Sequence, residues 1–321
     1  MNLLGAHDPA VFFVNGLGDC VINMPALRAI TRLFCGRATL ICEEGDHSQL
    51  FDELCVKKRV HIKTAREASN RWVPSGQILQ EIPACDLFIS LVPWISDSLR
   101  AVIKKHRSVG FFRDYSIQIP LDFEKHSVDL AFDVAKLIDS HCKLEDYTTP
   151  IRFPNRAVAW VQEIQKLLPP GSRILTVHPD SLKEKMWNLE RLRTSIEVFL
   201  KRRSDYFVFV LGYQLLPFDR GLLNERIIPS QRIGFILSSC LVAHSDLFLG
   251  IDSCYMHVAD LARVPGVALF GPTNAREFGF RLGPNITIQG QRTLDEISTE
   301  TVIAALESIV DNPVQSATWT V

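Results

Sequence analysis

The chain has 321 residues, of which 47% are hydrophobic and 22% are charged, and its formal net charge is −1 at pH 7. This length suffices for one large domain or two of ordinary size. A nearly neutral chain lacks the strongly basic surface of most nucleic-acid-binding proteins, so its composition argues against that class. The eight cysteines include no Cys-x-x-Cys pair. This favours reduced core thiols over a disulfide framework or a metal site.

The sequence also argues against a membrane span. No stretch reaches the roughly 20 apolar residues that a transmembrane helix needs. His7 and Asp8 stand where a signal peptide would carry basic residues. We therefore expect a cytoplasmic protein without a transmembrane segment, and peripheral attachment at the inner membrane stays open as an alternative.

The first half of the chain alternates short apolar runs with amphipathic stretches. This pattern predicts a parallel sheet that is covered by helices on both faces. The predicted strands are 10–15, 38–43, 59–63, 85–91 and 107–112, and the predicted helices are 21–34, 47–55 and 97–106.

A segment rich in turn formers, residues 145–156, separates this half from a second alternation. We expect two Rossmann-like domains, 1–153 and 154–321, with a cleft between them. In such sheets, ligands bind at the carboxyl ends of the strands. The predicted helices of the second half are 157–168, 188–202, 232–244, 256–263 and 299–310, and the predicted strands are 173–179, 206–212, 246–251 and 264–271.

The first candidate motif follows the first predicted strand, where Gly16 and Gly18 precede Asp19 at the start of a helix. It is not the dinucleotide-binding fingerprint, because Val21 occupies the position of the third glycine. Asp19 has two interpretations. It is either a plain helix N-cap or a general base that faces the cleft.

The second and third motifs lie in the second half. Asp180, Ser181 and Lys185 follow the strand that ends near His178, which suits either a phosphate clamp or a solvated loop. Asp252 and Ser253 follow another strand and precede a helix. Amides at such a helix start can bind an anion. The alternative is that Asp252 or Ser253 caps the helix and that His257, in the same helix, is a core residue.

In order and spacing, these motifs resemble the heptosyltransferases of glycosyltransferase family 9. The resemblance spans nearly the whole chain, and it implies the α/β GT-B fold. The third motif departs from the family pattern, with Ile251, Cys254 and Tyr255 in place of asparagine, glycine and proline. The matching segments are GLGDCVINMPALRAI (16–30), KMWNLERL (185–192) and IDSCYMHVADLARVPGVALFGPT (251–273).

The resemblance implies an inverting transferase that moves a sugar, expected to be a heptose, from an ADP-linked nucleotide-diphosphate donor to an acceptor hydroxyl. Asp19 and Lys185 would be catalytic. No Asp-x-Asp motif is present, so we expect neither a metal nor a further cofactor. The N-terminal domain would bind the acceptor through Gly18, Asn23 and Arg113. The C-terminal domain would bind the donor through Asp180, Ser181, Lys185, Asp252, Ser253, Cys254, Tyr255, His257 and Thr273.

Two alternatives stay open. A nucleotide-sugar epimerase can share this architecture, but it would need an acid–base set around the diphosphate. A non-catalytic binding or scaffold protein would fit the departures at Cys254 and Tyr255. For a transferase, the acceptor could be lipopolysaccharide core, a natural-product intermediate or a protein.

Overall fold

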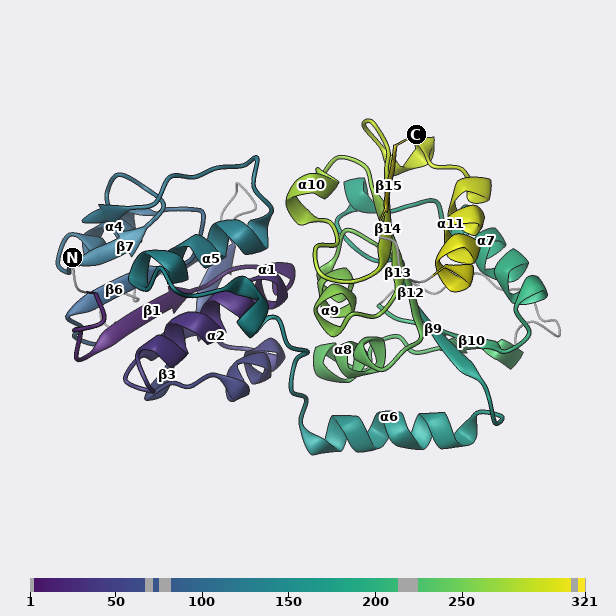
Figure 1. The fold of residues 1–321 in the computed structure, drawn as a ribbon, viewed down its shortest axis with the longest axis horizontal. Helices are drawn as coiled ribbons and strands as arrows, with labels where there is room; N and C mark the ends of the chain where they lie inside the picture. The colour runs from purple at the N-terminus through teal and green to yellow at the C-terminus, as the bar shows by residue number, and fades with distance from the viewer. Residues whose placement is uncertain (1–2, 67–71, 75–81, 213–224, 313–316, 321) are drawn as a thin grey trace. The chain divides into compact units, whose positions relative to one another are not determined.

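The computed structural model describes residues 3–66, 72–74, 82–212, 225–312 and 317–320 (Figure 1). The chain divides into two compact units, Met1–Thr149 and Pro150–Val321. The predicted boundary lies after residue 153, within the same turn-rich segment. Each unit is an α/β layer structure in its own right, as the alternation of the sequence predicts.

The sheet of the first unit has six strands in the order β3-β2-β1-β6-β7-β8, and all of its pairs are parallel. Its central strand β1 is buried along its whole length, and Phe12 and Phe13 supply much of the apolar surface. A separate antiparallel pair, β4 and β5, was not predicted. The strands are β1 (Pro9–Phe13), β2 (Thr39–Glu43), β3 (Lys58–Ile62), β4 (Thr64–Arg66), β5 (Trp72–Pro74), β6 (Leu87–Ser90), β7 (Ser108–Gly110) and β8 (Ile117–Gln118).

The predicted helix 21–34 is wrong as a single element, because the structure has two helices that meet at Asn23. Pro25 has no N–H to donate to the carbonyl four residues earlier, so a continuous helix breaks here. Helix α2 packs against α5. Helix α5 itself was not predicted from the sequence. The helices of this unit are α1 (Leu17–Ile22), α2 (Met24–Leu33), α4 (Asp97–Ile103) and α5 (Ser127–Ile138), with 3₁₀ turns η1 (Asp46–Glu53) and η2 (Leu144–Tyr147).

The sheet of the second unit has seven parallel strands in the order β11-β10-β9-β12-β13-β14-β15. Strands β11, β14 and β15 were not predicted. The strands are β9 (Arg173–His178), β10 (Tyr206–Val210), β11 (Ile227–Pro229), β12 (Leu247–Ile251), β13 (Gly266–Phe270), β14 (Asn285–Gln289) and β15 (Ala317–Thr320).

Helices cover both faces of this second sheet. Figure 1 shows α7 and α11 on one side of the strands and α8 and α9 on the other. The core beneath α7 and α11 includes Ile196, Phe199 and Leu306, all fully buried. Burial of this kind is the main stabilising term of such a layer. The helices are α6 (Asn155–Leu167), α7 (Leu189–Arg202), α8 (Phe235–Ala243), α9 (Cys254–Ala262), α10 (Ala275–Phe278) and α11 (Thr299–Asp311), with 3₁₀ turns η3 (Lys183–Lys185) and η5 (Leu294–Glu296).

Candidate active site

The strand order of the second sheet reverses between β9 and β12, which are neighbours in the sheet although β10 and β11 intervene in sequence. At such a point the connections leave toward opposite faces, and a crevice opens at the carboxyl ends of the strands. The segments after β9 and β12 carry the second and third sequence motifs. The fold therefore brings these two motifs together at the edge where ligands usually bind.

Asp252, just after β12, is the centre of this edge. Its Oδ2 accepts hydrogen bonds from Lys185 Nζ at 2.5 Å and from Thr273 Oγ1 at 2.7 Å. Ser181 Oγ donates to the Asp252 carbonyl oxygen at 3.1 Å. Three segments, which follow β9, β12 and β13, thus meet at one residue that is only 7% exposed. Among the described residues, none donates a hydrogen bond to the second carboxylate oxygen, Oδ1.

Glu277 on α10 is a second carboxylate of this edge, and the sequence motifs did not reveal it. Its pKa is raised, first by partial burial and then by the negative charge of Asp252. The α10 turn is held by Asn274, whose side chain accepts from the amide of Arg276. Gln289 also accepts from the amide of Ala275 at 2.8 Å. These contacts fix the segment that carries both Thr273 and Glu277.

Ser253 is the N-cap residue of α9, but its side chain makes no capping hydrogen bond. Its Oγ instead lies 2.9 Å from His178 Nδ1 at the end of β9. Asp252 precedes the cap and bonds to Lys185 and Thr273. The interpretation that one of these two side chains merely caps the helix is therefore wrong.

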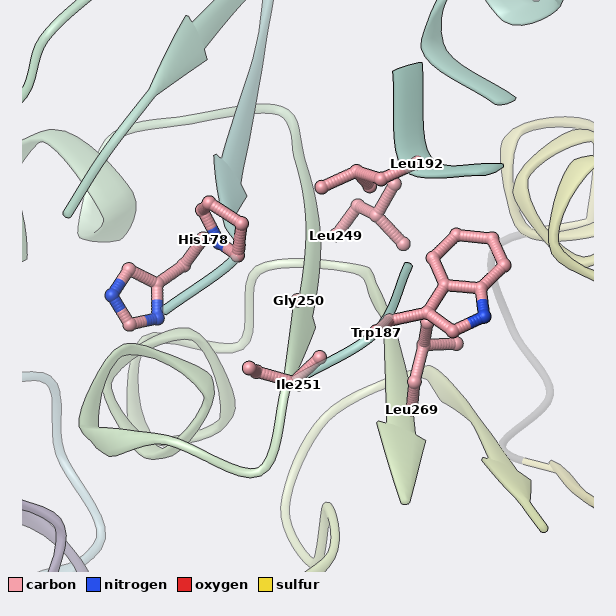
Figure 2. Close-up of a pocket in the computed structure, with 8 residues that line it drawn as sticks. His178, Trp187, Leu192, Leu249, Gly250, Ile251 and Leu269 are labelled. Carbon is pink, nitrogen blue, oxygen red and sulfur yellow. The ribbon is translucent and has the colours of Figure 1, made fainter. Parts of the chain in front are cut away.

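His178 was not among the predicted site residues, because it reads as the last position of an apolar strand. It is 6% exposed, and burial lowers its pKa to about 3, so the ring is neutral near pH 7. Its ring packs edge-on against Tyr255 with centroids 4.5 Å apart. Figure 2 shows the ring pointing away from the Trp187 indole, on the far side of a small cavity. That cavity is lined chiefly by apolar side chains such as Leu249 and Leu269, so it is a gap in the core.

Two of the three departures from the family pattern, Cys254 and Tyr255, are accommodated within the unit. Tyr255 is 8% exposed and packs against both His178 and Phe235. Burial of the Cys254 thiol raises its pKa to about 12, so it stays protonated. His257 lies buried on the same helix. The side chains of these three residues are therefore not suited to bind an anion. The backbone amides at a helix start are the groups that generally do so.

The Lys-x-Trp motif has a structural role next to its lysine. Trp187 is buried, and its Nε1 donates to the Ile297 carbonyl oxygen at 3.3 Å. Arg191 donates to the same oxygen at 3.1 Å. Asn188 caps α7 by accepting from two amides of the first turn. This cluster fixes the segment just after Lys185, and it thereby restrains the backbone from which the lysine side chain extends.

Asp180 turns toward the other side of the strand β9. Gly212, just after β10, has φ +97°, and a Cβ placed there would lie 2.0 Å from Asp180 Oδ2. A side chain at residue 212 would therefore collide with this carboxylate as well as strain the backbone. Asp180 thus packs against β10, whereas its neighbour Ser181 reaches β12.

In the first unit, Asp19 lies just after β1, at the point where strand order reverses between β1 and β6. The N-cap of α1 is Gly16 and Asp19 is the third helical residue, so the plain N-cap interpretation of Asp19 is wrong. Asn23 is 6% exposed, and its Nδ2 donates to the Asp19 carbonyl oxygen at 2.9 Å. Its side chain thus ties α1 to α2. Gly18 lies within α1, and Arg113 is exposed between β7 and β8.

Three further expectations concern the whole chain. All eight cysteines lie in the described ranges, and no two of them form a disulfide. Across those ranges, no three His, Cys, Asp or Glu side chains gather as metal ligands would. No helix among the described residues is both long and apolar enough to cross a bilayer.

We predict that His178 makes the stability of the second unit depend on pH. Its folded pKa of about 3 lies below the unfolded value of 6.5, so its contribution is complete above pH 6.5 and is lost as pH falls toward 3. Between pH 7 and pH 5 the His178 ring should account for about 2 kcal/mol of lost unfolding free energy. Urea unfolding of the parent and of His178→Asn at both pH values measures this loss. Equal losses in the two proteins would contradict the prediction.

Comparisons with known proteins give one sequence-profile match and several structures of similar fold. Residues 238–302, which include Asp252, Ser253 and Thr273, match the sequence profile of glycosyltransferase family 9 (heptosyltransferase). No curated protein matches the chain by sequence. A family 9 glycosyl transferase from Veillonella parvula shares the fold with a TM-score of 0.76 and 20% identity, over 95% of this chain and 97% of that one.

Two Escherichia coli structures are also similar. ADP-heptose lipopolysaccharide heptosyltransferase II has a TM-score of 0.70 and 14% identity, over 95% of this chain and 99% of that one. Heptosyltransferase WaaC with ADP has a TM-score of 0.64 and 15% identity, over 94% of this chain and 99% of that one. The chain therefore has the GT-B fold. The partial sequence match and the shared fold together confirm the predicted resemblance to glycosyltransferase family 9, and they support glycosyltransferase activity for this chain.

Proposed function

We propose that the chain is an inverting, metal-independent transferase that moves a heptose from an ADP-linked donor to an acceptor hydroxyl. The observation that carries this proposal is the convergence of Lys185, Thr273 and Ser181 on Asp252 at the β9–β12 reversal. It lies at the edge where α/β sheets bind ligands. The neighbouring WaaC structures contain ADP or ADP-2-deoxy-2-fluoro heptose, which supports an ADP-linked donor.

Lys185 is suited to hold the donor diphosphate. Its ammonium group has three N–H donors, and the structure gives one of them to Asp252. The other two can bind phosphate oxygens without breaking that ion pair. The start of α9, just after Asp252, adds backbone amides and the positive end of the helix dipole. Together these groups can stabilise the negative charge that develops on a departing diphosphate.

Asp252 and Glu277 are suited to the sugar. Lys185 and Thr273 bind Asp252 Oδ2, which leaves Oδ1 to accept a hydrogen bond from a sugar hydroxyl. Partial burial and the charge of Asp252 raise the pKa of Glu277, which favours the protonated form that can donate a hydrogen bond. A polyhydroxylated sugar offers both donors and acceptors to such a pair.

The chemistry follows in one displacement. The acceptor oxygen attacks the anomeric carbon while the bond from that carbon to the diphosphate oxygen breaks. The acceptor proton passes to the Asp19 carboxylate, and the diphosphate leaves with the bonding electrons. Attack from the face opposite the leaving group inverts the configuration. Gly18, Asn23 and exposed Arg113 belong to the unit that we assign to the acceptor, and Arg113 would suit an anionic acceptor.

We predict that Lys185→Ala weakens ADP binding and slows turnover at least tenfold, because a charge-assisted hydrogen bond to phosphate is lost. The variant also leaves the buried Asp252 carboxylate without its ion pair, so its Tm should fall, but Thr273 still bonds Asp252 and the unit should still fold. Lys183→Ala is the matched control, because Lys183 lies exposed in the same 3₁₀ turn. Calorimetric ADP titration and melting curves test both variants. Parent-like ADP affinity in Lys185→Ala would refute the phosphate role.

We predict that Asp19→Asn lowers kcat by roughly 10²- to 10⁴-fold, the usual contribution of a general base. The amide keeps the size of the carboxylate but cannot take the acceptor's proton. ADP affinity should change little, because we assign the donor to the other unit. Measuring kcat, ADP Kd and Tm on one preparation separates a chemical from a structural defect. A parent-like rate at a parent-like Tm would exclude Asp19 as the base.

We also predict that turnover persists in excess EDTA, because Lys185 and the α9 amides would supply the charge stabilisation that a divalent ion gives elsewhere. The assay compares initial rates before and after dialysis against the chelator. Loss of activity that Mg²⁺ or Mn²⁺ restores would overturn the metal-independent mechanism.

A further inference from the structure

Two cysteines of the first unit lie at the surface, contrary to the expectation that the cysteines belong to the core. Cys35 and Cys55 are exposed, whereas the other six are buried or half-buried. Burial raises the pKa of most of those six, to about 12 for Cys42 and to about 11 for Cys85, which keeps their thiols protonated. Cysteine chemistry needs an accessible thiolate. Cys35 and Cys55 are therefore the thiols that a dissolved reagent reaches first.

The two exposed cysteines precede neighbouring strands. Strands β2 and β3 are parallel partners, and just before them the Lys57 amide donates to the Ala38 carbonyl oxygen at 2.8 Å. The two segments thus run side by side as they enter the sheet at its amino-terminal edge. Continuing the register of the two strands backward places Cys55 opposite Gly36, the residue after Cys35.

A close contact agrees with this alignment. A Cβ placed on Gly36 would lie 3.4 Å from Cys55 Sγ, so this thiol rests against the backbone next to Cys35. On ordinary strand spacing and rise, the Cα atoms of Cys35 and Cys55 would lie about 6 Å apart. Disulfides join Cα atoms that are roughly 4.4–6.8 Å apart, so the backbone suits a bond between these two residues.

Hydrogen bonds hold the turn that carries Cys35. After α2 ends at Leu33, the Cys35 amide donates to the Arg32 carbonyl oxygen at 2.9 Å and the Arg37 amide donates to that of Phe34 at 3.0 Å. Cys35 has φ +50°, a left-handed conformation that costs energy outside glycine and that clusters at functional sites. Its Sγ lies 3.9 Å from the Leu33 carbonyl oxygen, a weak contact that rotation about the Cα–Cβ bond can replace.

We propose that Cys35 and Cys55 form a reversible disulfide, with a low-molecular-weight disulfide such as oxidised glutathione as the oxidant. One protein thiolate attacks a sulfur of the small disulfide and displaces one small thiolate, which leaves a mixed disulfide. The other protein thiolate then attacks the protein-bound sulfur and displaces the second small thiolate. The two cysteines thus lose two electrons and two protons, and the small disulfide takes up both and becomes two thiols. This inference is independent of the proposed function.

The experiment incubates the folded parent chain with oxidised and reduced glutathione, traps free thiols with N-ethylmaleimide and digests the protein with trypsin and a glutamate-specific protease. Cleavage separates Cys35, in residues 33–37, from Cys55, in residues 54–57, and leaves Cys42 on a third peptide. We expect the first two peptides to form the main cross-link, which dithiothreitol removes. Glutathione adducts without this linked pair, or equally frequent links to other cysteines, would overturn the inference.

Cys35→Ser and Cys55→Ser should each carry a glutathione adduct on the remaining exposed cysteine and no linked pair, because the second thiol is gone. Cys142→Ser is the matched control and should cross-link like the parent, because Cys142 is half-buried in the same unit and burial raises the pKa of its thiol. The oxidised parent should melt no lower than the reduced chain, since a cross-link that fits the native backbone adds no strain. A Tm several degrees lower would show that the fold must distort to form the bond, and it would contradict the proposal.

Discussion

The β9–β12 edge of the second unit depends on the charge of Asp252. A carboxylate that is 7% exposed is costly unless it is paired and hydrogen-bonded, and Lys185 and Thr273 supply those partners. Because the partners follow β9 and β13, the carboxylate fixes two loops relative to the end of its own strand. The same ion pair that stabilises the edge also presents a lysine with two further N–H donors, so in the proposed function stability and donor binding use one interaction.

The six strands of the first sheet have the same order as six of the second, which adds β15 at one edge, and both units carry their polar residues where that order reverses. Asp19 follows β1 in the first unit, and Ser181 and Lys185 follow β9 in the second. These are equivalent positions in two copies of one architecture. Parallel strands are buried on both faces, so their carboxyl ends are the places where polar side chains can be held rigidly without interrupting the core.

Local patterns predicted most of the buried strands, most helices and the three motifs, because each depends on neighbours in sequence. Strands β11, β14 and β15 were missed. The three residues of β11, Ile227–Pro229, are too few to show a pattern, whereas the alternating NITIQ of β14, Asn285–Gln289, carried a strand signal that was overlooked. The helix break at Asn23 was readable from Pro25. Local sequence patterns could not identify His178 or Glu277 as site residues. His178 belongs to the site through its contact with Ser253, 75 residues away, and Glu277 belongs to it through the nearby charge of Asp252.

The anchoring of Trp187 and Arg191 to the Ile297 carbonyl makes the lysine segment dependent on a distant part of the chain. Ile297 lies 110 residues after Trp187, directly before α11. The segment between η5 and α11 is thus a structural support for the loop that carries Lys185. During synthesis, this loop would gain its final geometry only after the segment at Ile297 has been made and has docked against Trp187 and Arg191.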